Sequence, residues 1–204
     1  MDKAPYDQRL ARPLARPLAA CGVHPNAVTA FTLLLALAAA WLFADGGQGA
    51  ANWAAGLFVL SRFLDHLDGE LARLTGTSSK LGYYFDYASG AFSYGALFLG
   101  MALGLSKGSL GHWALVLGAL AGVLALIAAL LNISLDRLEE LDEGKAVGYP
   151  GLAGFELEDG IYLLAPITWI GALAPFFVAA VAGTVVYALW TSWRVLRSRA
   201  RARR

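Results

Sequence analysis

Long uncharged apolar runs constrain this chain more than any other feature. Four of them cover residues 25–44, 46–61, 81–106 and 108–135, with Asp86 as the one charge inside them, and a fifth covers 160–193. A helix that crosses about 30 Å of hydrocarbon needs about 20 apolar residues. Hydrophobic residues make up 58% of the chain and charged residues 15%, whereas a soluble domain has roughly 45–50% and 25%. The chain is therefore expected to be an integral membrane protein.

The number of crossings follows from the lengths of these runs. The second run continues through Leu64, and the last is too long for a single crossing. Gly171 to Pro175 offers a turn inside the last run, so we divide it into helices at roughly 157–172 and 174–194. The prediction is an all-α membrane protein with six transmembrane helices. We expect residues 1–204 to form one membrane domain.

Basic residues indicate the orientation in the membrane. They gather before the first crossing, between alternate crossings and after the last one, and the opposite loops hold only Lys107. The positive-inside rule then places both termini in the cytoplasm, most simply at a bacterial cell (inner) membrane. Residues 1–22 repeat Ala-Arg-Pro-Leu and are expected to lie in the membrane interface, where Pro13 and Pro17 should disturb a regular helix. Residues 194–204 form a basic cytoplasmic tail.

Three acids stand at the cytoplasmic ends of the second and third predicted crossings. Asp65 and Asp68 are three residues apart and so share one helix face, while Asp86 enters the next helix after a short connection. Inserting a carboxylate into a membrane crossing costs a few kcal/mol of free energy even on lenient scales. Such a residue is therefore expected to have an interaction partner or a functional role. A hard divalent cation such as Mg²⁺ or Mn²⁺, which prefers oxygen ligands, would relieve the repulsion among the three. The alternative for each acid is a helix cap or an ion pair with Arg62 or Arg73.

The spacing of these residues resembles a family signature. The run Asp65-His66-Leu67-Asp68-Gly69-Glu70-Leu71-Ala72-Arg73, followed by Gly82 and Asp86, is similar to the signature of the CDP-alcohol phosphotransferases. Seven positions of the signature match at the required spacings. The segment from His24 to Thr29 also resembles the Pro-Asn-x-x-Thr start of the first helix in many members.

The resemblance implies a membrane enzyme of phospholipid biosynthesis that takes a CDP-linked donor, often CDP-diacylglycerol. Such an enzyme transfers the phosphate-bearing group to an alcohol or phosphate-containing acceptor and releases CMP. It commonly acts as a homodimer and needs Mg²⁺ or Mn²⁺. By this resemblance the metal ligands are Asp65, Asp68 and Asp86. The nucleotide site would be lined by Gly69, Ala72, Arg73 and Gly82.

The last aspartate of the signature is missing. The resemblance places it at position 90, one turn after Asp86, where this chain has Gly90. In the family that residue is taken as the base that deprotonates the acceptor hydroxyl and as a ligand of a second metal. General-base assistance is typically worth 10²–10⁴-fold in rate. The departure therefore concerns the chemistry as well as the fit to the signature.

Three explanations for Gly90 stay open. A relocated base is the first, and Glu158 or Asp159, in an acidic group with Glu156 at the start of the fifth predicted crossing, could supply it. His66 is expected instead to be packed or hydrogen-bonded. The second explanation is an acceptor that attacks through a phosphate or carboxylate oxygen and needs no base. The third is a non-catalytic homologue that only binds nucleotide. A transporter is disfavoured, because its acids should lie near the bilayer midplane.

Overall fold

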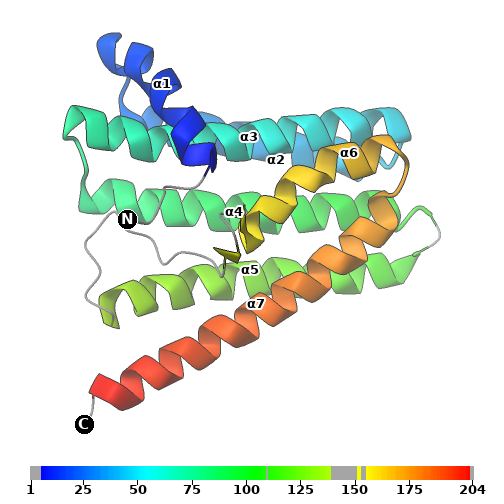
Figure 1. Ribbon diagram of the computed structural model, residues 1–204. Coiled ribbons are helices and arrows are strands. Elements are labelled where there is room, and N and C mark those ends of the chain that lie inside the picture. The colour runs from blue at the N-terminus through cyan, green and yellow to red at the C-terminus, as the bar shows by residue number, and fades with distance from the viewer. Residues whose placement is uncertain (1–5, 109, 139–150, 153–154, 203–204) are drawn as a thin grey trace.

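The structure, a computed structural model, describes residues 6–108, 110–138, 151–152 and 155–202, and the side chains of 6–12, 151–152, 155–159 and 201–202 lie outside the description. The described chain is almost wholly helical (Figure 1). In chain order the elements are α1 (Tyr6–Ala20), α2 (Pro25–Asp45), α3 (Gln48–Thr75), α4 (Lys80–Leu105), α5 (His112–Leu138), β1 (Gly151–Leu152), β2 (Phe155–Glu156), the 3₁₀ helix η1 (Leu157–Leu163), α6 (Leu164–Trp169) and α7 (Leu173–Ala202). β1 and β2 are a two-residue antiparallel pair, so the helical fold class is confirmed for the described residues.

Each long helix packs mainly against one or two other long helices. Helix α2 packs against both α3 and α4, α4 packs against α5, and α5 packs against α7. Helix α1 lies on α3, and the short α6 also rests on α3 (Figure 1). The two helices that carry the predicted site, α3 and α4, are thus held together mainly through α2.

Four of the described helices are long and apolar enough to cross a membrane: α2, α4, α5 and α7. This supports an integral membrane protein. Helix α3 has 28 residues, but its second half carries the charged motif and it is not among the four. The predicted crossing at 157–172 consists of η1 and a six-residue α6, because Pro166 would clash with the preceding turn of a continuous α-helix. Six crossings and the sidedness of the termini are not confirmed.

The prediction for the N-terminal segment was wrong in one respect. Pro13 and Pro17 were expected to disturb a regular helix, yet both lie inside the continuous helix α1. Proline removes one backbone N–H and leaves the carbonyl four residues earlier without its helical donor. Both prolines are exposed. Leu18 near the end of α1 packs on a buried cluster that includes Leu67 and Leu71 of α3.

Small residues let α2, α4 and α5 approach closely. An added Cβ at Gly100 of α4 would stand 2.2 Å from the carbonyl oxygen of Ala40, and one at Gly104 would stand 2.1 Å from that of Phe43. On the other side of α4, a Cβ at Gly118 of α5 would meet the carbonyl oxygen of Phe98 at 2.8 Å. These glycines serve internal packing, which fixes α4 between its two neighbours.

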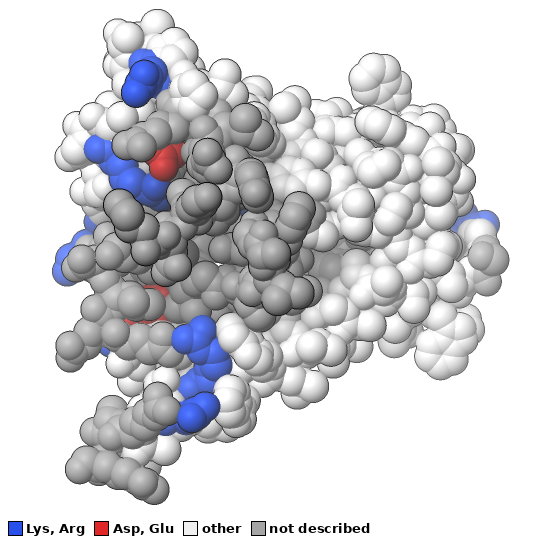
Figure 2. Space-filling view, in the orientation of Figure 1, with Lys and Arg blue, Asp and Glu red and all other residues white. Residues whose placement is uncertain are grey.

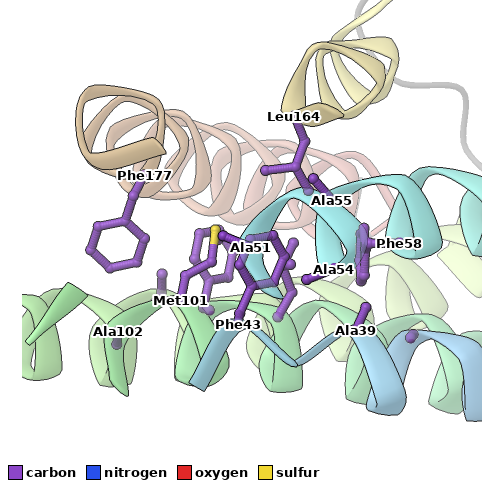
Figure 3. Close-up of a cluster of buried hydrophobic side chains, with 14 of the residues drawn as sticks. Ala39, Phe43, Ala51, Ala54, Ala55, Phe58, Met101, Ala102, Leu164 and Phe177 are labelled. Carbon is purple, nitrogen blue, oxygen red and sulfur yellow. The ribbon is translucent and has the colours of Figure 1, made fainter. Parts of the chain in front are cut away.

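The apolar core lies beyond the charged end of the bundle. Its largest fully buried side chains include Phe43 of α2, Phe58 of α3, Met101 of α4 and Phe177 of α7. Figure 3 shows Phe43 and Met101 in the middle of this cluster with Phe177 and Phe58 on either side, and Leu164 of α6 above Ala55 of α3. Figure 2 shows Lys, Arg, Asp and Glu gathered at the end of the molecule where α3 ends and α4 begins, while the visible surface beyond it is almost free of charge. The motif therefore lies at one end of a rigid apolar bundle.

Candidate metal centre

The turn between α3 and α4 brings the three predicted metal ligands together. Helix α3 ends at Gly76, whose φ of 66° is readily adopted only by glycine. Helix α4 starts after Ser79, whose hydroxyl accepts a hydrogen bond from the backbone N–H of Gly82 at 3.0 Å. The chain thus reverses direction over four residues. One carboxylate oxygen from each of Asp65, Asp68 and Asp86 lies within 4.8 Å of the others.

This donor set fits a hard divalent cation. Three carboxylates, with Asp68 buried, Asp65 half-buried and Asp86 exposed, offer the oxygen ligands that Mg²⁺ and Mn²⁺ prefer. The exposure of Asp86 leaves one side of the cluster accessible from outside the protein. Without a cation, the three negative charges would repel one another in surroundings of low dielectric constant.

Two threonines of α2 orient the ligands from behind. The Thr29 hydroxyl donates to Asp68 Oδ2 at 2.5 Å, and the Thr32 hydroxyl donates to Asp65 Oδ1 at 3.1 Å. Both threonines are buried and stand three residues apart, on one face of α2. Thr29 belongs to the sequence motif at the start of α2, whereas Thr32 was not predicted to take part in the site. Their spacing on an otherwise apolar helix was the available signal.

Replacing Thr29 with valine is expected to weaken metal binding about tenfold or more. Hydrogen bonds to metal ligands typically contribute 10–100-fold to affinity or activity, and valine keeps the shape of threonine while removing the donor to Asp68. Calorimetric titration with Mn²⁺ would measure the change. Thr184→Val is the matched control, because the Thr184 hydroxyl donates to the carbonyl of Ala180 in its own helix. Equal affinities in the two variants would show that Thr29 does not orient Asp68.

Arg62 is part of the same site. It is 4% exposed, pairs with Asp65 three residues later on α3, and places its guanidinium carbon 5.4 Å from the ring centre of Tyr94 on α4. The alternative of an ion pair with Arg62 is thus confirmed for Asp65, and the three carboxylates still converge. His66 Nδ1 lies 2.8 Å from the backbone carbonyl oxygen of Arg62, which agrees with its expected structural role.

The predicted nucleotide residues lie around the metal ligands. Gly69 follows Asp68 directly, and Arg73 lies further along α3, half exposed and paired with Glu70 at 2.6 Å. Gly82 faces α2, where an added Cβ would stand 3.1 Å from Asn26 Oδ1 and 3.2 Å from Ser79 Oγ. Ala72 is half-buried one turn beyond Asp68. A small residue at position 82 therefore keeps α4 close to the start of α2, and nucleotide binding by these residues stays a prediction.

Gly90, at the position of the missing aspartate, has free space around it among the described residues. In the part of the chain that the structure describes, no atom outside the local helix lies within 4 Å of a Cβ added at Gly90, so these residues leave room for a larger side chain there. The predicted replacement bases, Glu158 and Asp159, belong to η1, but their side chains lie outside the described residues. Their approach to the three carboxylates stays a prediction.

A second polar cluster, which no sequence pattern predicted, joins α4 to α5. Asp136, which follows directly after the apolar run 108–135, lies buried inside α5. Its Oδ2 accepts hydrogen bonds from the hydroxyls of Tyr83 at 2.5 Å and Tyr87 at 2.7 Å, both from α4. The spacing of four between the tyrosines was a signal for a shared helix face, but nothing in the sequence linked them to an acid about fifty residues away.

Comparison with known proteins decides the family. Residues 22–196 match the CDP-alcohol phosphatidyltransferase family. The chain belongs to this family. It is also 35% identical over 91 residues to the archaetidylinositol phosphate synthase of Pyrococcus horikoshii, an alignment that covers 45% of this chain and 47% of that protein. The chain thus spans about half the length of this curated relative.

Solved structures share the fold of this family member. Phosphatidylinositol phosphate synthase of Mycobacterium tuberculosis in complex with manganese and citrate matches with a TM-score of 0.69 at 20% identity, over 91% of this chain and 88% of that one. The same protein with CDP-DAG bound also gives a TM-score of 0.69 at 20% identity, over 92% and 94%. At this identity the likeness establishes the helical fold, and the site must be argued from the residues of this chain.

Proposed function

We propose that this protein is a metal-dependent membrane transferase that moves a phosphatidyl or related phospho-alcohol group from a CDP-linked donor to an acceptor and releases CMP. The observation that carries the proposal is the convergence of Asp65, Asp68 and Asp86 within 4.8 Å in a chain of the CDP-alcohol phosphatidyltransferase family. CDP-diacylglycerol is the favoured donor, since a fold relative was solved with CDP-DAG bound. The active site would face the cytoplasm of a bacterial cell, in a homodimer with six crossings per chain.

Different residues of the site would bind different parts of the donor. Asp65, Asp68 and Asp86 would hold Mg²⁺ or Mn²⁺, which when bound neutralises the diphosphate and favours departure of CMP. Gly69, Ala72 and Gly82 would leave room for the nucleotide against the backbone. The Arg73 guanidinium would pair with a phosphate oxygen, in exchange for its present partner Glu70.

The transfer step needs a nucleophilic oxygen on the acceptor. That oxygen forms a bond to the donor phosphorus that carries the lipid, while the bond from this phosphorus to the oxygen of CMP breaks. A hydroxyl acceptor also gives up its proton, and Glu158 or Asp159 would receive it. An acceptor that attacks through a phosphate or carboxylate oxygen has no proton to give up and would need neither residue.

Release of CMP tests the proposed function directly. The purified protein in detergent would be incubated with CDP-diacylglycerol, Mn²⁺ and a pooled extract of small alcohols and phosphates, with Asp86→Ala as the control. We expect CMP that depends on both Mn²⁺ and Asp86. Fractionation of the pool would then identify the acceptor. If no CMP forms while the protein still binds CDP, the second candidate, a non-catalytic nucleotide-binding homologue suggested by Gly90, is supported instead.

The predicted base has its own test. We expect Glu158→Gln or Asp159→Asn to keep the affinity for CDP and lower turnover by roughly 10²-fold or more, as loss of a general base does. Both would be measured on the fractionated acceptor. A variant with unchanged turnover removes that residue as the base. Unchanged turnover in both, together with an anionic acceptor, would favour transfer without a base.

A further inference from the structure

The Arg62 guanidinium is held in place from two sides. Its ion pair with Asp65 ties it to a predicted metal ligand on α3, and its contact with the Tyr94 ring, 5.4 Å from the ring centre, ties it to α4. The residue is 4% exposed, and an arginine keeps its charge at any physiological pH. A permanent positive charge is therefore built into the site.

Gly90 lies on the part of α4 next to this charge. Asp86, Gly90 and Tyr94 are each four residues apart, so they form one stripe along α4. Arg62 pairs with Asp65, which converges with Asp86, and stacks over Tyr94, so it bridges the two ends of this stripe. The open position 90 lies between those ends. A carboxylate side chain added at position 90 would thus start between the two groups on α4 that lie nearest to Asp65 and Arg62.

The charges of the described residues favour one cation. Three carboxylates and one guanidinium leave two negative charges, which a single divalent cation neutralises. Glu70 does not add to them, because it is paired with Arg73 at 2.6 Å. Before a donor diphosphate binds, a second divalent cation would leave two positive charges that these groups do not compensate, and excess charge of one sign beside the buried Asp68 is costly.

We propose that Arg62 is a fixed second cation of this site, so that Asp65, Asp68 and Asp86 hold a single divalent ion and the guanidinium supplies the remaining positive charge. The inference rests on the metal site of the proposed function and gives it a stoichiometry. It also gives a reason for Gly90: an aspartate there would pair with Arg62 and add a charge that one metal ion does not balance.

Counting bound Mn²⁺ tests this inference without any turnover. Free Mn²⁺ would be measured by electron paramagnetic resonance during titration of the detergent-purified protein. We expect one ion per wild-type chain. Arg62→Gln should bind that ion at least tenfold more tightly, because a neighbouring positive charge is gone. The double variant Arg62→Gln/Gly90→Asp, with four carboxylates and no guanidinium, should bind two ions.

The sign of the change separates this role from a purely structural one. If Arg62 merely positions Asp65, Arg62→Gln will bind Mn²⁺ more weakly, and that result in a protein with a normal elution profile overturns the inference. Two equally tight ions in the wild type also overturn it. No bound Mn²⁺ in the wild type would instead contradict the metal site of the proposed function.

Two further variants complete the design. Arg137→Gln makes the same change of charge on α5, where Arg137 donates to the Tyr84 hydroxyl at 2.7 Å, and should leave one ion bound with wild-type affinity. Gly90→Asp with Arg62 retained should bind a single ion more tightly. This variant keeps the test decisive if Arg62→Gln does not fold, since two ions bound in the presence of Arg62 would overturn the inference.

Discussion

Replacing Gly100 with alanine is expected to lower the melting temperature of the detergent-purified protein by roughly 6–12 °C. The added Cβ would stand 2.2 Å from the Ala40 carbonyl oxygen and 2.8 Å from the Ala40 carbonyl carbon. Those are backbone atoms, so no side chain can turn away, and α2 and α4 must separate. Overpacking of this kind costs about 3 kcal/mol, and each kcal/mol shifts the midpoint of a chain this size by about 2–4 °C.

Gly183→Ala is the matched control for this substitution. Gly183 lies inside α7, and a Cβ added there meets no atom of the described residues within 4 Å. Alanine is favoured over glycine in a helix by about 1 kcal/mol, so this variant should melt at or slightly above the wild-type temperature. Thermal unfolding followed by tryptophan fluorescence would measure both. If Gly100→Ala melts like Gly183→Ala, the close approach of α2 and α4 does not contribute to stability.

The sequence was sufficient for the long helices because membrane burial leaves a simple signal. The apolar runs at 25–44 and 81–106 correspond closely to α2 and α4. About twenty consecutive uncharged apolar residues are typical of a helix that crosses a membrane. Hydropathy was insufficient at 157–172, because an apolar composition does not specify an α-helix. There the 3₁₀ helix η1 comes first, and the α-helix α6 begins only at Leu164, so that Pro166 stands in its first turn.

The site was predictable to the extent that its residues are close in sequence. Asp65, Asp68 and Asp86 stood out as charges next to apolar crossings, and one turn between two helices brings them together. The partners that complete the site come from other parts of the chain. Thr32 reaches Asp65 across the contact between α2 and α3, and such contacts depend on how the helices pack, which no local pattern specifies.

Asp68→Asn is expected to have opposite effects on activity and on stability. Asp68 is buried next to two other carboxylates, and its Oδ2 accepts a hydrogen bond from Thr29. Asparagine has almost the same shape, and its amide oxygen can still accept that bond. The variant loses the charge that holds the cation, so release of CMP should fall at least about 10³-fold, the scale of removing a principal electrostatic contact in catalysis. Without metal, it also loses a buried like-charge repulsion.

The stability measurement makes this prediction specific to a metal site. In the presence of a chelator, Asp68→Asn should melt a few degrees above the wild type, since removing a poorly compensated buried charge stabilises a fold by about 1 kcal/mol or more. Mn²⁺ at a hundred times its dissociation constant should then stabilise the wild type by about 2.7 kcal/mol and leave the variant unchanged. Asp45→Asn, at the exposed end of α2, should respond to Mn²⁺ like the wild type. A wild type that melts above Asp68→Asn under chelation would mean that the three carboxylates are already compensated by the protein, and that no cation is needed to hold them together.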